Sequence, residues 1–371
     1  MQKKIIALAV AGLVSGAAFA QSNVTIYGIA DAAYVYSKSD DNKFSGIDSG
    51  GWSGGRIGFR GEEALGNGLK AIFTYEFGSN IDENSAFNRT RQAFVGLSGG
   101  FGSVTLGRQY APSFLYLGAT SANDITGVNP VDLALGSYFV TMQTGDGSRW
   151  NNSVAYNSPN WSGLDFRVIY GFGESVGHRI TSEPTITIPS TPGEYPLEDI
   201  VGTDETDHGT YDTSDSGRFG LGVRYANGPL YLTAIYQQSE ESFNDVEDGT
   251  KAWAIGGNYD FKVVKVFANY VHQKYDDGDK QNLFSIGLGV PVSKAGTVHF
   301  EYMQFKDKSF DDENKAKGFG VGYYHDLSKR TRLYANVSQI DNDDNVKWGF
   351  SKTIIAGEKN TNLQLGIRHA F

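Results

Sequence analysis

The residues of this chain that most often carry chemistry are not spaced like a catalytic or metal-binding site. Cysteine is absent, which excludes disulfides and thiolate metal sites. The letters G-x-S-x-G occur at residues 51–55, 96–100 and 173–177, but no helical pattern follows them, so they do not predict the nucleophile elbow of a hydrolase. Repeated G-x-G pieces, as in residues 318–322, follow a strand pattern with no helix after it and do not predict a nucleotide loop. We therefore expect no enzyme activity, no metal site and no cofactor. The histidines are scattered without ligand spacing: His178, His208, His272, His299, His325 and His369.

The N-terminus reads as a cleavable secretory signal. Lys3 and Lys4 precede an apolar run at residues 5–14, and small residues lead to Ala18-Phe19-Ala20. We expect residues 1–20 to be removed, leaving a mature domain at residues 21–371. The alternative, a membrane anchor, needs about 20 apolar residues, and this run is shorter. No later stretch is long and apolar enough for a spanning helix, so a membrane-embedded form of this chain has to be a β-barrel.

Charge and composition narrow the class of protein further. The net charge of -10 becomes -12 once Lys3 and Lys4 are removed, which argues against nucleic acid as a partner. The chain is rich in Gly (47), Tyr (21) and Phe (23) and poor in Pro (9), which favours many strands with tight turns.

From Val24 onward, apolar or aromatic residues alternate with small or polar ones over short segments that end in turn residues. This period of two is typical of half-buried strands. The length of a membrane strand suggests about sixteen of them. They are expected to begin near Val24, Arg56, Leu69, Arg89, Gly102, Ser153, Gly163, Arg218, Pro229, Lys251, Val263, Asn282, Gly296, Ala316, Thr331 and Thr361.

The connections between these segments alternate in length. Short turns, such as residues 66–68 and 227–228, separate longer polar stretches. Tight turns on one rim and long loops on the other are typical of outer-membrane barrels. The long connections are predicted at residues 37–55, 79–88, 112–150, 173–217, 240–250, 276–281, 306–315 and 342–360.

The two faces of each segment differ in polarity. In residues 218–225, Phe219 and Leu221 share one face while Arg218 and Arg224 share the other. Alternation alone does not say which face points inward, because a soluble protein would bury the apolar set. The export signal favours a membrane barrel, and sixteen strands enclose a lumen too wide for side chains to fill, so the polar face is expected to line water.

Several segments resemble those of Gram-negative general porins of the β-proteobacterial type. They occur in the same order along the mature chain, at residues 24–28, 56–63, 91–97 and 102–108. The chain end at residues 366–371 is similar to the terminal signature of these proteins, with Phe371 as its last residue.

The resemblance implies an all-β fold, a 16-stranded antiparallel transmembrane barrel in the outer membrane, assembled as a homotrimer among lipid and lipopolysaccharide. The outer-membrane insertion machinery would recognise Phe371. Small hydrophilic solutes would diffuse through the channel. The third long loop, here residues 111–149, would fold into the lumen. Its apolar stretches at residues 114–117 and 131–140 favour packing against the wall over a disordered extracellular loop.

The same resemblance implies where solutes are selected. Porins of this family place acids on the inserted loop opposite arginines on the wall, and such a narrow charged aperture sustains a transverse field. The matching loop acids are Asp124 and Asp132, although the loop lacks an acidic Pro-Glu-Phe-Gly-Gly core. With fewer acids than arginines, we expect an anion preference. The wall candidates are Arg56 and Arg60, then Arg89 and Arg91, with Arg149 and Arg167 extending the row.

Some assignments remain open at this point. Phe94 places Arg89 and Arg91 in the lumen, whereas Val95 and Leu97 place them toward lipid. Each wall arginine is as well explained by an ion pair with a carboxylate such as Glu62 or Glu76.

Arg108 shares its face with Val104 and Leu106, which makes it a candidate trimer contact. Two other classes of function, a barrel-form enzyme and an adhesin, lack a supporting motif. Within the channel class, a pore specific for an organic anion or phosphate is the alternative to general diffusion.

Overall fold

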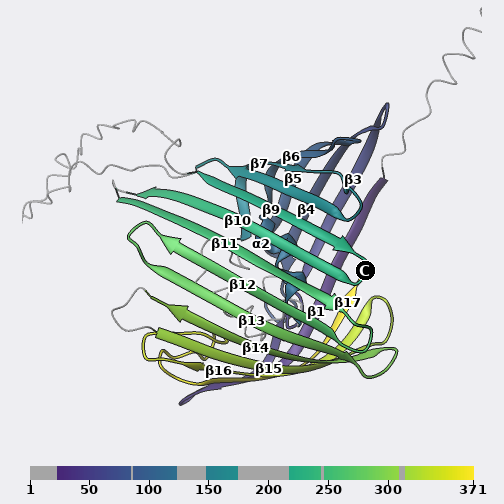
Figure 1. Cartoon of the computed structure of the whole chain (residues 1–371). Coiled ribbons are helices and arrows are strands. Elements are labelled where there is room, and N and C mark those ends of the chain that lie inside the picture. Colours follow the sequence, from purple (N-terminus) through teal and green to yellow (C-terminus); the bar gives the residue numbers. More distant parts are fainter. Residues whose placement is uncertain (1–22, 85–86, 123–147, 174–216, 244–245, 309–313) are drawn as a thin grey trace, which may run out of the picture.

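The chain forms one antiparallel sheet that closes on itself. The computed structural model describes residues 23–84, 87–122, 148–173, 217–243, 246–308 and 314–371, so the predicted signal peptide lies outside them. In the described residues, 17 strand segments follow one another around the sheet, and the first pairs with the last. No helix in this part of the chain is long and apolar enough to cross a membrane. Figure 1 shows β1 beside β17 at the closure.

The segments are β1 (Asn23–Ser39), β2 (Asn42–Ser49), β3 (Arg56–Gly66), β4 (Leu69–Ser79), β5 (Phe87–Gly99), β6 (Gly102–Tyr110), β7 (Arg149–Asn157), β8 (Leu164–Gly171), β9 (Arg218–Asn227), β10 (Leu230–Phe243), β11 (Val246–Asp260), β12 (Lys265–Tyr275), β13 (Lys280–Pro291), β14 (Gly296–Asp307), β15 (Asn314–Asp326), β16 (Thr331–Asn342) and β17 (Asn360–Ala370). Between β6 and β7 lie two short helices, α2 (Pro112–Tyr116) and η1 (Gly118–Thr120).

The segments β2 and β3 count as one barrel strand. Both pair with β1, β2 along its second half and β3 along its first half. The chain leaves the sheet between them, at residues 50–55, which we call the inward loop, and then rejoins it. The prediction of a 16-stranded antiparallel barrel is therefore confirmed.

Two of the predicted long connections are wrong, and a third is shorter than predicted. Residues 37–55 contain the end of β1, a tight turn at Asp40 and Asp41, and the whole of β2. Similarly, β10 and β11 extend through most of residues 240–250, and β12 and β13 leave only residues 276–279 between them. These segments are rich in Lys, Asp, Asn and Ser because their strands extend past the apolar band, where polar side chains cost nothing on either face.

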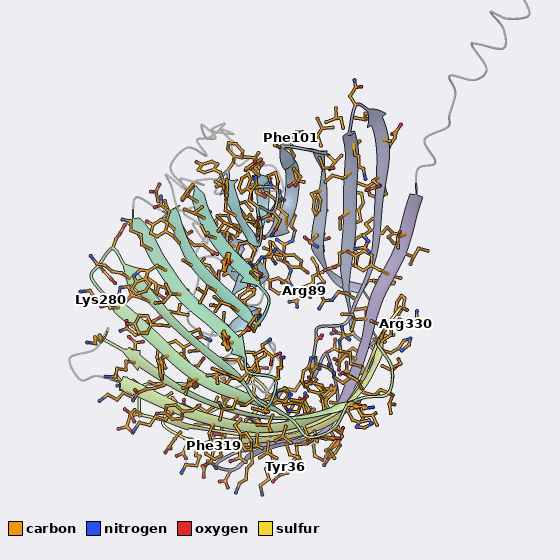
Figure 2. The ribbon with its side chains drawn as sticks, turned by 45° about the vertical axis from the view of Figure 1, so that its right-hand side comes forward. Tyr36, Arg89, Phe101, Lys280, Phe319 and Arg330 are labelled. Atoms are coloured by element: carbon orange, nitrogen blue, oxygen red, sulfur yellow. The ribbon has the colours of Figure 1, made fainter. Side chains whose placement is uncertain are left out.

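Alternation of the side chains separates an apolar outside from a polar inside. On the outer face, large apolar side chains stay exposed, as at Val95 (57%), Leu106 (56%) and Ile255 (53%). On the inner face, polar side chains such as Gln237 and Asn362 are buried. Figure 2 shows Phe319 on the outer side and Arg89 on the side of the interior. The polarity expected for a membrane barrel is the one observed.

The C-terminal residue bonds to the first strand where the barrel closes. The amide of Gly28 donates to the carbonyl of Phe371 at 3.1 Å, and the amide of Phe371 donates back to Gly28 at 3.1 Å. The Phe371 ring lies directly over Gly28, so that a Cβ at this position would come within 2.3 Å of the ring and 2.6 Å of the Arg56 carbonyl oxygen. Only glycine fits here without moving backbone.

We predict that Gly28→Val weakens the folded barrel by about 1–3 kcal/mol, the usual cost of forcing extra carbon atoms into a packed contact. Equilibrium unfolding in urea with the barrel in detergent micelles measures this. The matched control is Gly100→Ala, because a Cβ there meets no atom within 4 Å. Equal stability of the two variants would contradict the role assigned to Gly28.

Candidate functional site

Arg56 and Arg60 lie on the inner face of β3, as their spacing predicts. Ile57 and Phe59 alternate with them on the opposite face. The Arg56 Nε donates to the carbonyl of Gly54 at 3.0 Å, which ties this guanidinium to the inward loop. The Arg60 guanidinium lies 5.2 Å from the centre of the Tyr27 ring.

A β-bulge at Arg91 settles which way the second pair of arginines points. In the pairing of β4 with β5, Glu76 lies opposite Gln92 and Phe77 lies opposite Thr90, so Arg91 is an extra residue in β5. The bulge reverses the alternation at this point. Val95 and Leu97 therefore face outward while Arg89 and Arg91 both face the lumen.

Arg91 is held by a buried hydrogen-bonded cluster around Glu76. Its Nε donates to Glu76 Oε1 at 2.8 Å, and the side chains are only 3% and 4% exposed. The Tyr110 hydroxyl donates to the same oxygen at 2.5 Å, and the Tyr27 hydroxyl donates to Glu76 Oε2 at 3.0 Å. Arg91 thus takes the ion-paired form expected as an alternative, with Glu76. Glu62 pairs with Lys70 instead, at 2.7 Å.

Arg149 connects the wall to the inserted loop. Its guanidinium lies 5.0 Å from the ring centres of both Tyr110 on β6 and Phe114 on α2. Those two rings stack with their centres 4.1 Å apart and a 10° angle between planes. Arg149 also lies close enough to Arg89 and Arg91 for their positive charges to interact.

Arg167 continues the row on β8, where it is buried. It donates to Asn157 Oδ1 at 2.5 Å and to Gln109 Oε1 at 3.0 Å, so the side chain is bonded to neutral amides. The next inner position, Asp165, accepts from Arg224 at 2.6 Å and from the Tyr116 hydroxyl at 3.1 Å.

The sequence reasoning missed four inward arginines as members of the site: Arg218, Arg224, Arg332 and Arg368. Alternation had already placed Arg218 and Arg224 on the polar face of their strand, and the same signal could have added all four to the site. With these four, ten arginines of the described residues face the lumen from β3, β5, β7, β8, β9, β16 and β17.

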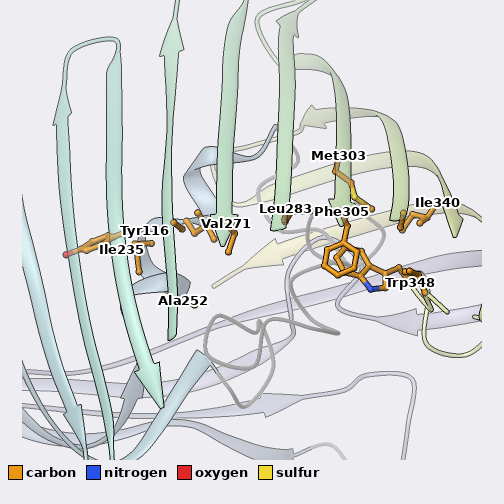
Figure 3. Close-up of a cluster of buried hydrophobic side chains, with 13 residues drawn as sticks. Tyr116, Ile235, Ala252, Val271, Leu283, Met303, Phe305, Ile340 and Trp348 are labelled. Carbon is orange, nitrogen blue, oxygen red and sulfur yellow. The ribbon is translucent and has the colours of Figure 1, made fainter. Parts of the chain in front are cut away.

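The start of the long third loop lies inside the barrel. Figure 1 shows α2 behind β10 and β11, and α2 and η1 contact β8 to β12. Tyr116 and Leu117 pack on inward apolar side chains that include Ile235, and the same cluster reaches Trp348 from the last loop (Figure 3). The end of η1 is held at Glu301, whose carboxylate accepts from Ser121 Oγ at 2.9 Å. The predicted packing of residues 114–117 against the wall is therefore observed. Asp124, Asp132 and residues 131–140 lie outside the described residues.

The inward loop is fixed by one buried carboxylate, Asp31. Its Oδ2 accepts from the backbone amides of Trp52 (3.1 Å) and Ser53 (2.8 Å), and its Oδ1 accepts from the Tyr334 hydroxyl at 2.5 Å. Gly51 lies against Tyr334 and Ala33 so tightly that a Cβ would clash. This clamp positions Gly54, which in turn carries the Arg56 contact, and nothing in the sequence suggested it.

Arg108 lies on the outer face of β6, as its parity predicts. Its Nε donates to the carbonyl of Thr90 at 2.7 Å, and it also bonds Asn151. Phe371 is 48% exposed at the end of the last strand.

The inner face of the described strands is lined by fixed charges and hydrogen-bonding groups. Within the described part of the chain, no three His, Cys, Asp or Glu side chains gather where they could hold a metal ion.

Residues 7–345 of the chain match the family model described as Gram-negative porin. The chain belongs to this family. The outer membrane porin protein 32 of Delftia acidovorans is 33% identical over 388 residues, covering 100% of both chains. An outer membrane porin protein of Bordetella pertussis strain Tohama I is 29% identical and also covers 100% of both.

Solved structures agree with this assignment. An anion-selective porin from Comamonas acidovorans superimposes on this porin with a TM-score of 0.76 at 30% identity, covering 95% of this chain and 100% of that one. The trimer form of OmpT from Vibrio cholerae reaches a TM-score of 0.65 at 15% identity and shows the shared fold alone. The predicted family is confirmed, and the porin is a non-enzymatic protein of the Gram-negative outer membrane.

We predict that Asp31→Asn destabilises the porin by about 1–3 kcal/mol, because an amide places its own N–H donors where three donors already converge. Urea unfolding followed by the fluorescence of the five tryptophans measures the stability. Asp40→Asn, in the exposed turn after β1, is the control. A stability loss in Asp40→Asn as large as in Asp31→Asn would argue against the clamp.

Proposed function

We propose that the porin forms a water-filled channel for passive diffusion of small hydrophilic solutes, with a preference for anions. The supporting observation is the inner row of arginines, Arg56, Arg60, Arg89, Arg91, Arg149 and Arg167, which outnumber the carboxylates beside them. Glu76 and Asp165 are each already bonded to an arginine. The remaining positive charge raises the local concentration of anions in the lumen.

The opposite wall supports the same proposal. The inward side chains of β10 to β13 in this region are largely apolar or neutral, such as Ile235, Val271, Leu283 and Gln273, and the start of the third loop packs on them. The inward carboxylate of Glu301 on β14 is bonded to Ser121 of that loop. A charged wall facing a neutral one leaves the field of the arginines largely unopposed on that side. The similar porin from Comamonas acidovorans is described as anion-selective, which agrees with this reading.

The solute-specific alternative, a channel for an organic anion or phosphate, differs in how it treats unrelated anions. The arginines form a continuous row. Arg149 lies close enough to Arg91, Arg91 to Arg56 and Arg56 to Arg368 for their positive charges to interact. A general pore loses conductance equally for all anions when part of the row is neutralised. A specific channel loses it mainly for its own solute.

We further propose that the porin is a homotrimer that uses the outer face of β6, where Arg108 lies among apolar side chains, as part of its contact. An arginine in an apolar outer band is costly in lipid and less so at a protein contact. The trimer form of OmpT is a structure of the same fold. The exposed ring of Phe371, at the end of the closing strand, is proposed as the signal for the barrel-assembly machinery.

Neutralising Arg56 and Arg60, which form no ion pair with a carboxylate of the described residues, tests the anion preference. In Arg56→Gln/Arg60→Gln, the reversal potential across a tenfold KCl gradient should keep its anion-favouring sign but shrink by roughly a third, because the other wall arginines remain. Planar-bilayer recordings measure it. Lys294→Gln, in the exposed turn between β13 and β14, is the control, because it also removes one positive charge per substituted residue but lies outside the arginine row. An unchanged potential in the double variant would refute the role of these arginines.

The trimer proposal has its own test. Native mass spectrometry should give three times the mature mass, and single-channel recordings should show openings in groups of three. Arg108→Glu should lower the temperature at which the trimer dissociates on unheated electrophoresis, since it places a carboxylate in the contact. A monomeric wild-type mass would exclude the trimer, and an unchanged dissociation temperature would exclude Arg108 from its contact.

A further inference from the structure

A separate cavity of about 390 Å³ lies between the inward loop and the turn that joins β15 to β16. This turn, at residues 327–330, belongs to the rim of short turns, which is the periplasmic rim in outer-membrane barrels. Figure 2 shows Arg330 at this edge of the barrel. The cavity adjoins the end of the arginine row at Arg368, and none of its lining residues lies on β3, β5, β7 or β8. Four of its lining side chains are cations: Lys329, Arg330, Arg332 and Arg368.

Arg332 is held in one orientation. Its Nε and Nη2 donate to the two carboxylate oxygens of Asp326 at 2.7 and 3.1 Å. Its guanidinium also lies 3.7 Å from the centre of the Tyr324 ring and 4.8 Å from that of Trp52. Stacking and the bidentate pair fix the plane of the group while Nη1 takes no part in the pair. Because the side chain is already ordered before a ligand binds, its loss of conformational entropy does not lower the affinity of the site.

Arg368 enters from the closing strand. Its Nε donates to Ser53 Oγ on the inward loop at 3.0 Å, and no carboxylate of the described residues lies within ion-pair distance of it. Lys329 and Arg330, on the turn, likewise form no ion pair with described residues. Asp326 is the single acid that lines the cavity and it is already paired with Arg332. Lys329 and Arg330 therefore add positive charge that no carboxylate of the described lining offsets, while Arg368 lies opposite the buried Asp31 in the pairing of β1 with β17.

We propose that this cavity binds a small solute through an oxyanion group, a carboxylate or a phosphate. Guanidinium groups recognise such groups by paired hydrogen bonds, and a fixed guanidinium does so with least loss of freedom. The volume suits a small molecule rather than a polymer.

The proposal rests on the anion-preferring pore and adds to it a resting site near the periplasmic mouth. Arg56 on the wall lies close enough to Arg368 for their charges to interact, so an anion leaving the arginine row stays within a continuous positive field until it reaches the cavity. Transport of the bound class then saturates, whereas chloride transport does not.

The test is the single-channel conductance of the whole porin as the concentration of the permeating salt is raised. Three potassium salts are compared: chloride, succinate and phosphate. We expect chloride conductance to rise almost linearly, and that of at least one oxyanion to saturate. Saturation with succinate alone assigns the site to carboxylates, and saturation with phosphate alone assigns it to phosphates.

Two variants locate the site. Lys329→Gln/Arg330→Gln changes only exposed turn residues, so the fold is not at risk, and it should raise the half-saturating concentration roughly threefold to tenfold, as expected for losing two solvent-exposed charge contacts. Arg332→Lys keeps the charge but removes the planar fork and should also weaken saturation. Lys294→Gln, on a neighbouring turn away from the cavity, should change nothing.

Linear conductance for both oxyanions would overturn the proposal, and so would saturation that the double variant leaves unchanged. The chloride reversal potential, recorded in the same experiment, reports separately on the pore. A cation-favouring potential together with retained oxyanion saturation would refute the anion preference and leave this site in place.

Discussion

Closure of the backbone hydrogen-bond network is the constraint on which everything else in this porin depends. Within lipid each amide and carbonyl has to find its partner in the protein, which excludes a free sheet edge. The first strand closes the network, because β1 pairs with β17 on one side and with both β2 and β3 on the other. The backbone exchange between Gly28 and Phe371 completes the ring at the chain terminus. Since the ladder fixes register, it also fixes which side chains face lipid and which face water.

The charged wall follows from that alternation, except at the β-bulge in β5. Arg56, Arg60 and Arg167 reach the lumen through strict alternation, but Arg89 and Arg91 reach it because an extra residue in β5 reverses the parity. Placing so many cations together costs energy through mutual repulsion and desolvation. Glu76 offsets part of this by accepting from Arg91, Tyr110 and Tyr27, and aromatic faces at Tyr110 and Phe114 offset more at Arg149. Arg56, Arg60 and Arg167 are held by a backbone carbonyl, an aromatic ring and neutral amides, respectively.

Much of this architecture could be predicted from the sequence, and the failures have a common cause. Period-two alternation and turn residues are local signals, and they predicted the strand number correctly. The export signal was needed to predict which face points outward, and the resemblance of several segments, including the chain end at Phe371, predicted the family. The bulge at Arg91 has no local mark, so the conflict between Phe94 and Val95 could not be resolved from parity. Asp31 and Tyr334 are 303 positions apart, and only the closed barrel brings them together on the inward loop. The segment at residues 42–49 reads as a loop because its strand stands beyond the apolar band.

The inward loop joins parts of the lumen that the strands alone would leave separate. The hydrogen bonds from this loop to Asp31 hold Gly54 beside Arg56 and Ser53 beside Arg368. One short segment therefore contacts both the arginine row and the cavity at the periplasmic rim. Trp52 at its tip supplies an aromatic face for Arg332. The sheet could not do this by itself, because side chains on one strand face are spaced too far apart along the barrel axis to form a continuous path. Leaving the sheet for six residues, at the one place where β1 has two successive partners, closes that gap without breaking the backbone ladder.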